Sequence, residues 1–254
     1  MYTHSELYNF LEEKVKQYNH PRFIETDPIQ VPRQFSKKEN IEIAGFLSAT
    51  IAWGQRTTII KNAQRLVQGM DNDPYGFLIN TTEDDWMHLS GFKHRTFNSS
   101  DLFFFLKSLQ NIYKYHGGLE NVFTSGFQID ETIYSALAYF RNVFFEIESP
   151  HRTQKHVSDV TRNSSAKRLN MFLRWMVRND DSGVDFGLWQ SIPASALMLP
   201  LDVHTGNISR GLGLLQRTQN DWKAVMEVAK KLVEFDPTDP VKYDFALFGI
   251  GAFE

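Results

Sequence analysis

Apolar residues recur along this chain at intervals of three and four positions, which is the spacing of one face of an α-helix. Ile41, Ala44, Leu47 and Ile51 follow this spacing, and similar runs occur over most of the sequence. The apolar–polar alternation of a half-buried strand is nearly absent. The pattern therefore predicts an all-α fold.

The periodicity, read together with Pro and Gly as boundary residues, predicts where the helices lie. We expect helices over residues 3–18, 39–53, 57–69, 100–115, 130–146, 165–178, 187–197, 203–213, 221–234 and 241–252. A chain of 254 residues is long enough for one large domain or for two packed lobes. No repeat or flexible linker divides it, so we expect a single all-α domain over residues 1–254.

The chain contains no cysteine, which excludes disulfides, thiolate zinc sites, iron–sulfur clusters and cysteine nucleophiles.

Its first residues lack the basic start and apolar run of a signal peptide. The longest apolar run, around Phe103–Leu106, is far too short to span a membrane. We expect a soluble, cytoplasmic protein with no membrane partner.

The formal net charge is −3, but positive charge is concentrated in one window. Residues 151–178 contain seven Arg and Lys against the single acid Asp159, a local net charge of +6. Such a window is either a solvated helix face or a surface that contacts phosphates. The charge pattern leaves both interpretations open.

This window contains Lys167, near the start of a helix whose register is readable. The expected buried stripe follows helical spacing and consists of Leu169, Phe172, Leu173 and Met176. The opposite face then carries Lys167, Met171, Arg174 and Arg178.

Asn163 or Ser164 is a good N-cap for this helix, which would place Lys167 in the first turn. The positive end of the helix dipole, together with Arg168, would lower the pKa of the lysine there. A neutral amine is the form that Schiff-base chemistry requires.

Asp202 follows Lys167 by 35 positions, in the segment Leu199-Pro200-Leu201-Asp202. An aspartate directly before an apolar-periodic run is typical of an N-cap. Two facing helix ends would bring Lys167 and Asp202 to one point, which indicates amine-based covalent chemistry. As an alternative, His204 and Asp202 form the beginning of a metal site, although no third ligand lies close in sequence.

Three segments give the chain a resemblance to a known family. One is the Ser-Ala-Lys start of the lysine helix together with LPLDVHTGNISRGLGLL, the second is FLSATIAWGQRTTIIKNAQRL, and the third is VKYDFALFGIGAF. With these the chain resembles the helix-hairpin-helix DNA glycosylase superfamily, most closely its archaeal 8-oxoguanine glycosylase branch. The Gly-rich hairpin that usually precedes the lysine helix is replaced by HVSDVTRNSS. The whole chain also resembles a bacterial family of this length whose role is not assigned.

The resemblance implies a two-lobed helical fold with a cleft between the lobes. One lobe would span about 40–163, and the other about 1–39 together with 164–254. It also implies roles for particular residues. The catalytic pair would be Lys167 and Asp202. Base recognition would fall to Gln55, Asp244, Phe248 and Trp53. The DNA backbone would be contacted by Arg162, Arg168, Arg174 and His204.

The activity that the resemblance implies is that of a bifunctional DNA glycosylase/AP lyase. It would excise an oxidised purine such as 8-oxoguanine from DNA through a Schiff base on the lysine, with no metal and no cofactor. The alternative is a noncatalytic module that binds distorted or single-stranded nucleic acid. A third possibility is a protein-binding scaffold. The sequence leaves the oligomeric state open.

Overall fold

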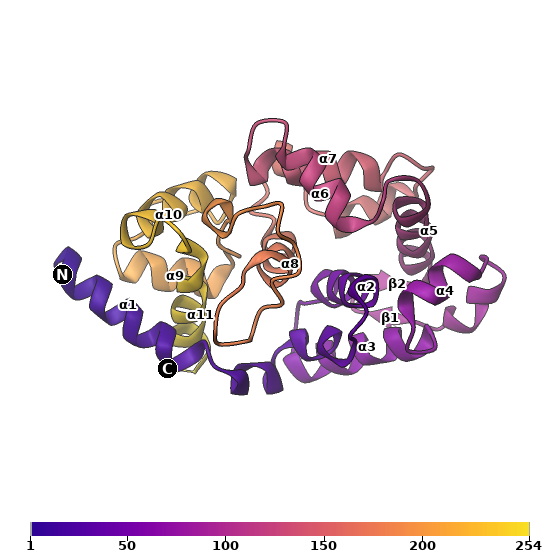
Figure 1. Ribbon diagram of the computed structural model, residues 1–254, viewed down its shortest axis with the longest axis horizontal. Coiled ribbons are helices and arrows are strands. Elements are labelled where there is room, and N and C mark those ends of the chain that lie inside the picture. The colour runs from indigo at the N-terminus through magenta and orange to yellow at the C-terminus, as the bar shows by residue number, and fades with distance from the viewer. Residues whose placement is uncertain (1, 254) are drawn as a thin grey trace. The chain divides into compact units, whose positions relative to one another are not determined.

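The computed structural model describes residues 2–253, and the chain forms two compact units (Figure 1). The first, which we call the lysine unit because it contains Lys167, combines the chain up to Glu25 with the chain from Asp159 onward. The second, the hairpin unit, spans Thr26–Ser158. The lobe limits and the cleft implied by the resemblance stay predictions.

The hairpin unit is built from α-helices, short 3-10 helices and a β-hairpin. Its α-helices are α2 (Lys38–Thr50), α3 (Arg56–Gly69), α4 (Pro74–Asn80), α5 (Ser99–Tyr115), α6 (Leu119–Phe127) and α7 (Ile133–Phe144). Its 3-10 helices are η2 (Pro28–Gln30), η3 (Pro32–Gln34), η4 (Asp85–Leu89) and η5 (His151–His156). The antiparallel strands are β1 (Lys93–His94) and β2 (Phe97–Asn98).

Side-chain caps explain where two helices of this unit, α4 and α5, begin. The Asn98 side chain accepts a hydrogen bond from the Asp101 amide at 3.2 Å, and the Asp101 carboxylate accepts one from the Asn98 amide at 3.0 Å. This reciprocal pair is a capping box, and it starts α5 directly after the hairpin. Asp73 caps α4, with Pro74 at the first helical position, where its fixed φ suits a helix.

Phenylalanine rings fill the core of the hairpin unit. Phe46 of α2 lies 5.9 Å from Phe105 of α5 and 5.5 Å from Phe140 of α7, measured between ring centroids. Phe123 of α6 stacks on Phe140 at 4.3 Å. All four rings are buried, so α2, α5, α6 and α7 share one aromatic core. Each such pair contributes about 0.5–1.5 kcal/mol beyond its buried area.

The lysine unit contains the two ends of the described chain. Its α-helices are α1 (His4–Tyr18), α8 (Lys167–Val177), α9 (Val203–Gly211), α10 (Trp222–Phe235) and α11 (Tyr243–Phe253). Its 3-10 helices are η1 (Pro21–Thr26), η6 (Val160–Arg162), η7 (Ala194–Ala196) and η8 (Pro240–Lys242).

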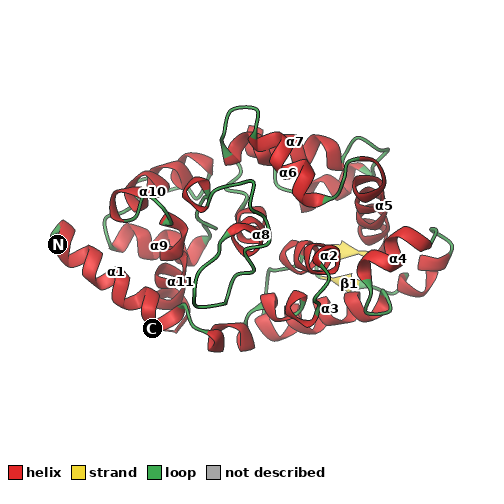
Figure 2. Cartoon of the chain, viewed as in Figure 1, coloured by secondary structure: helices red, strands yellow, loops and turns green. Residues whose placement is uncertain are grey.

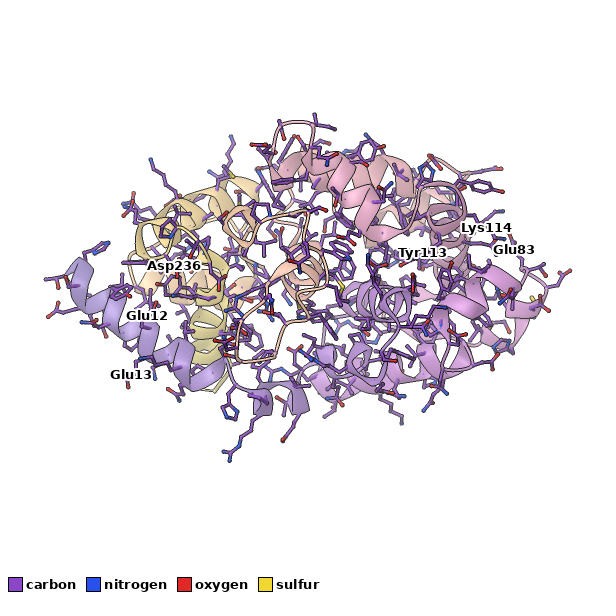
Figure 3. The ribbon with its side chains drawn as sticks, viewed as in Figure 1. Glu12, Glu13, Glu83, Tyr113, Lys114 and Asp236 are labelled. Carbon is purple, nitrogen blue, oxygen red and sulfur yellow. The ribbon has the colours of Figure 1, made fainter. Side chains whose placement is uncertain are left out.

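Helix α11 packs against both α1 and α9. At the α1 contact a Cβ on Gly249 would lie 2.1 Å from the Tyr18 ring, so only glycine fits there. A polar contact supports the same helix pair, because Lys242, the last residue of η8 directly before α11, forms ion pairs with Glu12 of α1 at 2.8 Å and with Asp236 at 2.7 Å. Figure 3 labels these two carboxylates on the lysine unit. The first helix is thereby fixed to the last.

The all-α prediction is confirmed, since the strands found within residues 2–253 are the two short ones of the hairpin (Figure 2). The predicted helix over 187–197 is wrong. Gly187 adopts a left-handed φ of 59° and Pro193 interrupts the backbone hydrogen bonds, so only η7 is helical there. None of the helices within the described residues combines the length and apolar character needed to cross a bilayer.

The sequence pattern also missed α4, α6 and the β-hairpin. Both helices are short, with 7 and 9 residues, so each offers only about two turns of periodicity. The strands have two residues each, which is too short for any alternation to be visible.

The aromatic core generates a stability prediction. Phe140→Ala should lower the free energy of unfolding by about 3–5 kcal/mol, because it removes a buried ring that contacts two other helices. Urea denaturation measures this change. Tyr115→Ala is the control, since Tyr115 is 77% exposed and its loss should cost less than about 0.5 kcal/mol. Equal effects of the two substitutions would contradict the assigned core.

Candidate active site

Lys167 is the first residue of α8, and an unusual backbone conformation precedes it. Ala166 occupies the N-cap position with a left-handed φ of 49° and no side-chain cap. The predicted caps, Asn163 and Ser164, are therefore wrong. Asn163 turns with a left-handed φ of 65° at the end of η6, and Ser164 pairs with Asp221 in an isolated bridge, so the helix starts later.

Asp202 is the N-cap of α9, as its sequence context predicts. Its Oδ1 accepts hydrogen bonds from the backbone amides of His204 at 2.8 Å and Thr205 at 3.0 Å. The Thr205 hydroxyl accepts in return from the Asp202 amide at 2.9 Å, and Asn220 donates to the Asp202 carbonyl at 2.9 Å. The backbone and the carboxylate of Asp202 are thus both fixed.

The second carboxylate oxygen of Asp202 faces the lysine. The distance from Lys167 Nζ to Asp202 Oδ2 is 4.0 Å, and the side chains are 25% and 27% exposed. The amine also lies 3.7 Å from Met171 Sδ, one turn further along α8. A partly exposed amine beside a fixed carboxylate combines a nucleophile with a group that can take its proton.

A third carboxylate, Asp244 of α11, lies in the same electrostatic environment. Burial raises the pKa of Asp244 to about 6, an effect that the positive charges of Arg174 and Lys167 oppose and the negative charge of Asp202 reinforces. The ionisation of Asp244 therefore depends on both members of the Lys167–Asp202 pair. The structure brings these three predicted site residues together.

Arg174 holds Asp244 in place. Its Nη1 donates to Asp244 Oδ2, and its Nε donates to Asp185 Oδ1 at 3.2 Å. Arg178, one turn further along, contacts the other oxygen of Asp185 at 3.2 Å. Arg174 was predicted to contact a DNA phosphate, but its guanidinium is buried and engaged by two carboxylates.

The predicted exposed face of the lysine helix is wrong. Met171, Arg174 and Arg178 are buried, because α8 is enclosed on all sides from Leu169 to Val177. The arginines enter the interior by pairing with carboxylates from other segments. The positive window over 151–178 is therefore not one exposed surface.

The other residues predicted in this unit have different surroundings. Phe248 packs edge-to-face on Phe23, with 5.8 Å between ring centroids, and is half-buried. Arg162 is exposed on η6, where Asp159 lies 3.5 Å away. Burial lowers the pKa of Arg168 to about 10. His204 is exposed in the first turn of α9.

Gln55 and Trp53 belong to the hairpin unit. Gln55 is the extended N-cap residue of α3, and its side chain makes no capping hydrogen bond. Trp53 lies in the loop between α2 and α3 and is half-buried. Their roles in base recognition stay predictions.

Several residues that hold the site were missed in the sequence. The spacing of Asp202 and Thr205 is that of a capping box, and this signal could have identified Thr205. Asp185 and Asn220 lie in loops, where no periodic pattern marks them. Among residues 2–253, no three His, Asp or Glu side chains are grouped so as to hold a metal ion.

The fold and the site define an all-α protein with a lysine–aspartate pair formed between the starts of two helices. A family model described as "Protein of unknown function (DUF2400)" matches residues 27–253, so the chain belongs to the DUF2400 family. No curated protein and no solved structure matches it.

This match overturns the assignment to the helix-hairpin-helix glycosylase superfamily. The structure gives a physical reason in the segment before α8. In place of a Gly-rich hairpin, residues 159–166 form the 3-10 turn η6, a left-handed Asn163 and the bridge from Ser164 to Asp221. This backbone is fixed by side chains such as Asp159, which accepts from the Thr161 amide at 3.0 Å.

The two contacts of Asp202 can be separated by substitution. Asp202→Ala should lower the free energy of unfolding by about 1 kcal/mol, because it removes an N-cap. Asp202→Asn should change it by only a few tenths of a kcal/mol, since asparagine caps equally well and a partly exposed ion pair contributes little. Urea denaturation of both variants tests this. Equal decreases in unfolding free energy in the two variants would show that Asp202 does not stabilise the protein through its N-cap.

The raised pKa of Asp244 predicts that the stability of the protein depends on pH. Its folded pKa of about 6 lies above its ordinary value of 3.8, so the folded state favours the protonated carboxyl. That contribution is complete below 3.8 and is lost as the pH rises through about 6. As the pH rises over this range, the unfolding free energy of the wild-type protein should fall relative to that of Asp244→Asn. Urea denaturation at several pH values measures this difference between the two proteins. A difference that stays constant over the range would refute the raised pKa of Asp244.

Proposed function

We propose that this protein is a DNA repair glycosylase and AP lyase that excises an oxidised purine, of the 8-oxoguanine type, through a Schiff base on Lys167. The observation that carries the proposal is the 4.0 Å separation between Lys167 Nζ and Asp202 Oδ2. The other oxygen of Asp202 is committed to the cap of α9, so the oxygen facing the amine has a fixed direction. Such a pair needs a substrate with an electrophilic carbon and no cofactor.

The first step replaces the base by the lysine. Asp202 takes a proton from the Lys167 ammonium, and the freed lone pair forms a bond to C1′ of the sugar. The glycosidic bond breaks, and its electron pair leaves with the base. The proton on Asp202 then passes to the departing base, which restores the carboxylate. A general base of this kind contributes about 10²–10⁴-fold in rate.

The second step breaks the strand. The nitrogen bound to C1′ forms a C=N bond as the C1′–O4′ bond opens and O4′ takes a proton, which gives the Schiff base. Loss of a C2′ proton then expels the 3′ phosphate by β-elimination. Water hydrolyses the C=N bond and releases Lys167. The positive charge on the imine nitrogen develops beside the Asp202 carboxylate, which stabilises it.

The roles of the surrounding residues follow from their contacts. Arg162 and His204 are exposed and close in sequence to the catalytic pair, so we assign them to phosphate contacts. The phosphate contact of Arg168 stays a prediction, since this side chain is half-buried and burial lowers its pKa to about 10. Arg174 instead positions Asp244, whose carboxyl we assign to the polar edge of the extruded base. Extrusion costs a few kcal/mol, and a damaged base lowers that cost.

Borohydride trapping tests the proposal. Wild-type protein should form a covalent adduct with a duplex that contains 8-oxoguanine, and Lys167→Gln should form none while it still binds the duplex. Asp202→Asn should slow adduct formation by about 10²–10⁴-fold. Lys155→Gln is the matched control, because Lys155 is an exposed lysine of the same positive window and should react as the wild type does.

A comparison of different duplex substrates distinguishes the glycosylase from a lyase alone and from a noncatalytic binding module. An adduct with an abasic duplex alone would keep the lyase and exclude 8-oxoguanine as the base. Binding without an adduct on any duplex, from folded protein, would favour the noncatalytic nucleic-acid-binding module. Lyase activity that survives in folded Lys167→Gln would refute the role of the lysine.

A further inference from the structure

In the hairpin unit, the tip of the β-hairpin lies against the loop between α2 and α3. Arg95 at this tip is so close to Gly54 that a Cβ on Gly54 would be 2.9 Å from Arg95 Nη1 and 3.3 Å from Cδ. Gly54 has a φ of +105°, a conformation that glycine adopts readily. Arg95 is exposed, and no carboxylate within the described chain pairs with it. Its guanidinium is therefore available to an external anion.

Trp53 precedes Gly54 and contacts two imidazole rings. It meets His94 edge-to-face at 4.9 Å and stacks on His156 at 6.0 Å, measured between centroids. The Trp53 carbonyl accepts a hydrogen bond from His94 Nε2 at 3.0 Å. Both the backbone and the indole of this half-buried residue are thus held in place.

His94 is fixed in one neutral form. Asn62 Nδ2 lies 2.9 Å from His94 Nδ1, and because an amide nitrogen only donates, Nδ1 must accept. The ring proton therefore lies on Nε2, which donates to the Trp53 carbonyl. Burial lowers the pKa of His94, and this favours the same neutral form.

His156 is held by Asp101, with 3.3 Å between Nε2 and Oδ2. Asp101 is fully buried and accepts from Thr153 at 2.8 Å and from Arg152 at 2.6 Å. Arg152 also donates to the Thr96 carbonyl at the hairpin tip at 3.1 Å. The buried carboxylate of Asp101 thus anchors both His156, on which Trp53 stacks, and the hairpin turn that carries Arg95.

We infer that Trp53 and Arg95 form a binding site for an unpaired nucleotide of a nucleic-acid strand. The base stacks on the indole, and a phosphate pairs with the guanidinium. An aromatic ring beside a cation is the combination that binds single strands without sequence preference. Lys93, exposed on the same hairpin, adds a second cation, which a strand with successive phosphates can use and one free nucleotide does not need.

This inference goes beyond the chemistry of Lys167, because it uses no residue of the lysine unit. The ligand for its test is a fluorescein-labelled, undamaged oligothymidine, which contains no abasic site and so cannot form a Schiff base. Fluorescence anisotropy over a series of salt concentrations gives the affinity and its log–log salt dependence for the full chain.

The two residues should give different signatures. Trp53→Leu should weaken binding by about 5- to 150-fold and leave the salt slope unchanged, because a stacked base is lost without a charge. Trp53→Phe should retain most of the affinity. Arg95→Gln should reduce the salt slope by about 0.7, the value for one contact to a single-strand phosphate.

A second aromatic–cation pair of the same unit supplies the controls. Lys114 and Tyr115 are exposed neighbours at the end of α5, and Figure 3 labels Lys114. Tyr115→Leu and Lys114→Gln should bind as the wild type does. Circular dichroism and thermal midpoints establish that each variant is folded.

Three outcomes would overturn the inference. They are absence of binding by the wild-type protein, equal losses in the Trp53–Arg95 and the Tyr115–Lys114 variants, and displacement of the oligothymidine by dTMP at equal nucleotide concentration. The last outcome would assign the site to a free nucleotide. Borohydride trapping of the same variants on a lesion duplex reports separately on Lys167, so failure of either proposal is recognisable by itself.

Discussion

The guanidinium of Arg174 lies between two buried carboxylates, Asp244 of α11 and Asp185 of the loop that follows α8, and this contact fixes α8 within the lysine unit. Arg178 continues the network to Asp185 and Asp239. Taking each ion out of water costs several kcal/mol, which only well-placed opposite charges offset. Burial raises the pKa of both Asp244 and Asp239, so these two acids hold protons more readily than free aspartates. The ammonium of Lys167 stands at the edge of this acidic region.

Asp202 illustrates how a structural contact and a chemical contact can share one side chain. One oxygen completes the first turn of α9, and the other faces the lysine. Because the cap fixes the rotation of the carboxylate, no further residue is needed to direct it. The amine has less support, since Met171 Sδ is a weak acceptor, and this leaves it free to move towards a substrate.

The sequence predicted features that depend on local pattern. Helical periodicity identified the long helices, and the Pro-Leu-Asp context identified the Asp202 cap. The buried face of α8 was misassigned because Arg174 and Arg178 are polar by type. Their pairings with Asp185 and Asp244 join residues 7 to 70 positions apart, and local spacing holds no trace of these pairings. The hairpin cluster around Trp53 was equally invisible, since Asp101, Thr153 and His156 converge only after α5 and η5 have packed.

The left-handed backbone of Ala166 makes Lys167 the first residue of α8. A helix that began one position earlier would enclose Lys167 within its first turn, although the side chains further along would keep their directions. Ala166 resists such a start, because its φ of 49° is incompatible with α-helical geometry, and it is fully buried. A single backbone angle outside the helix therefore sets where α8 begins, and it places the amine at the end of the helix instead of along its buried body.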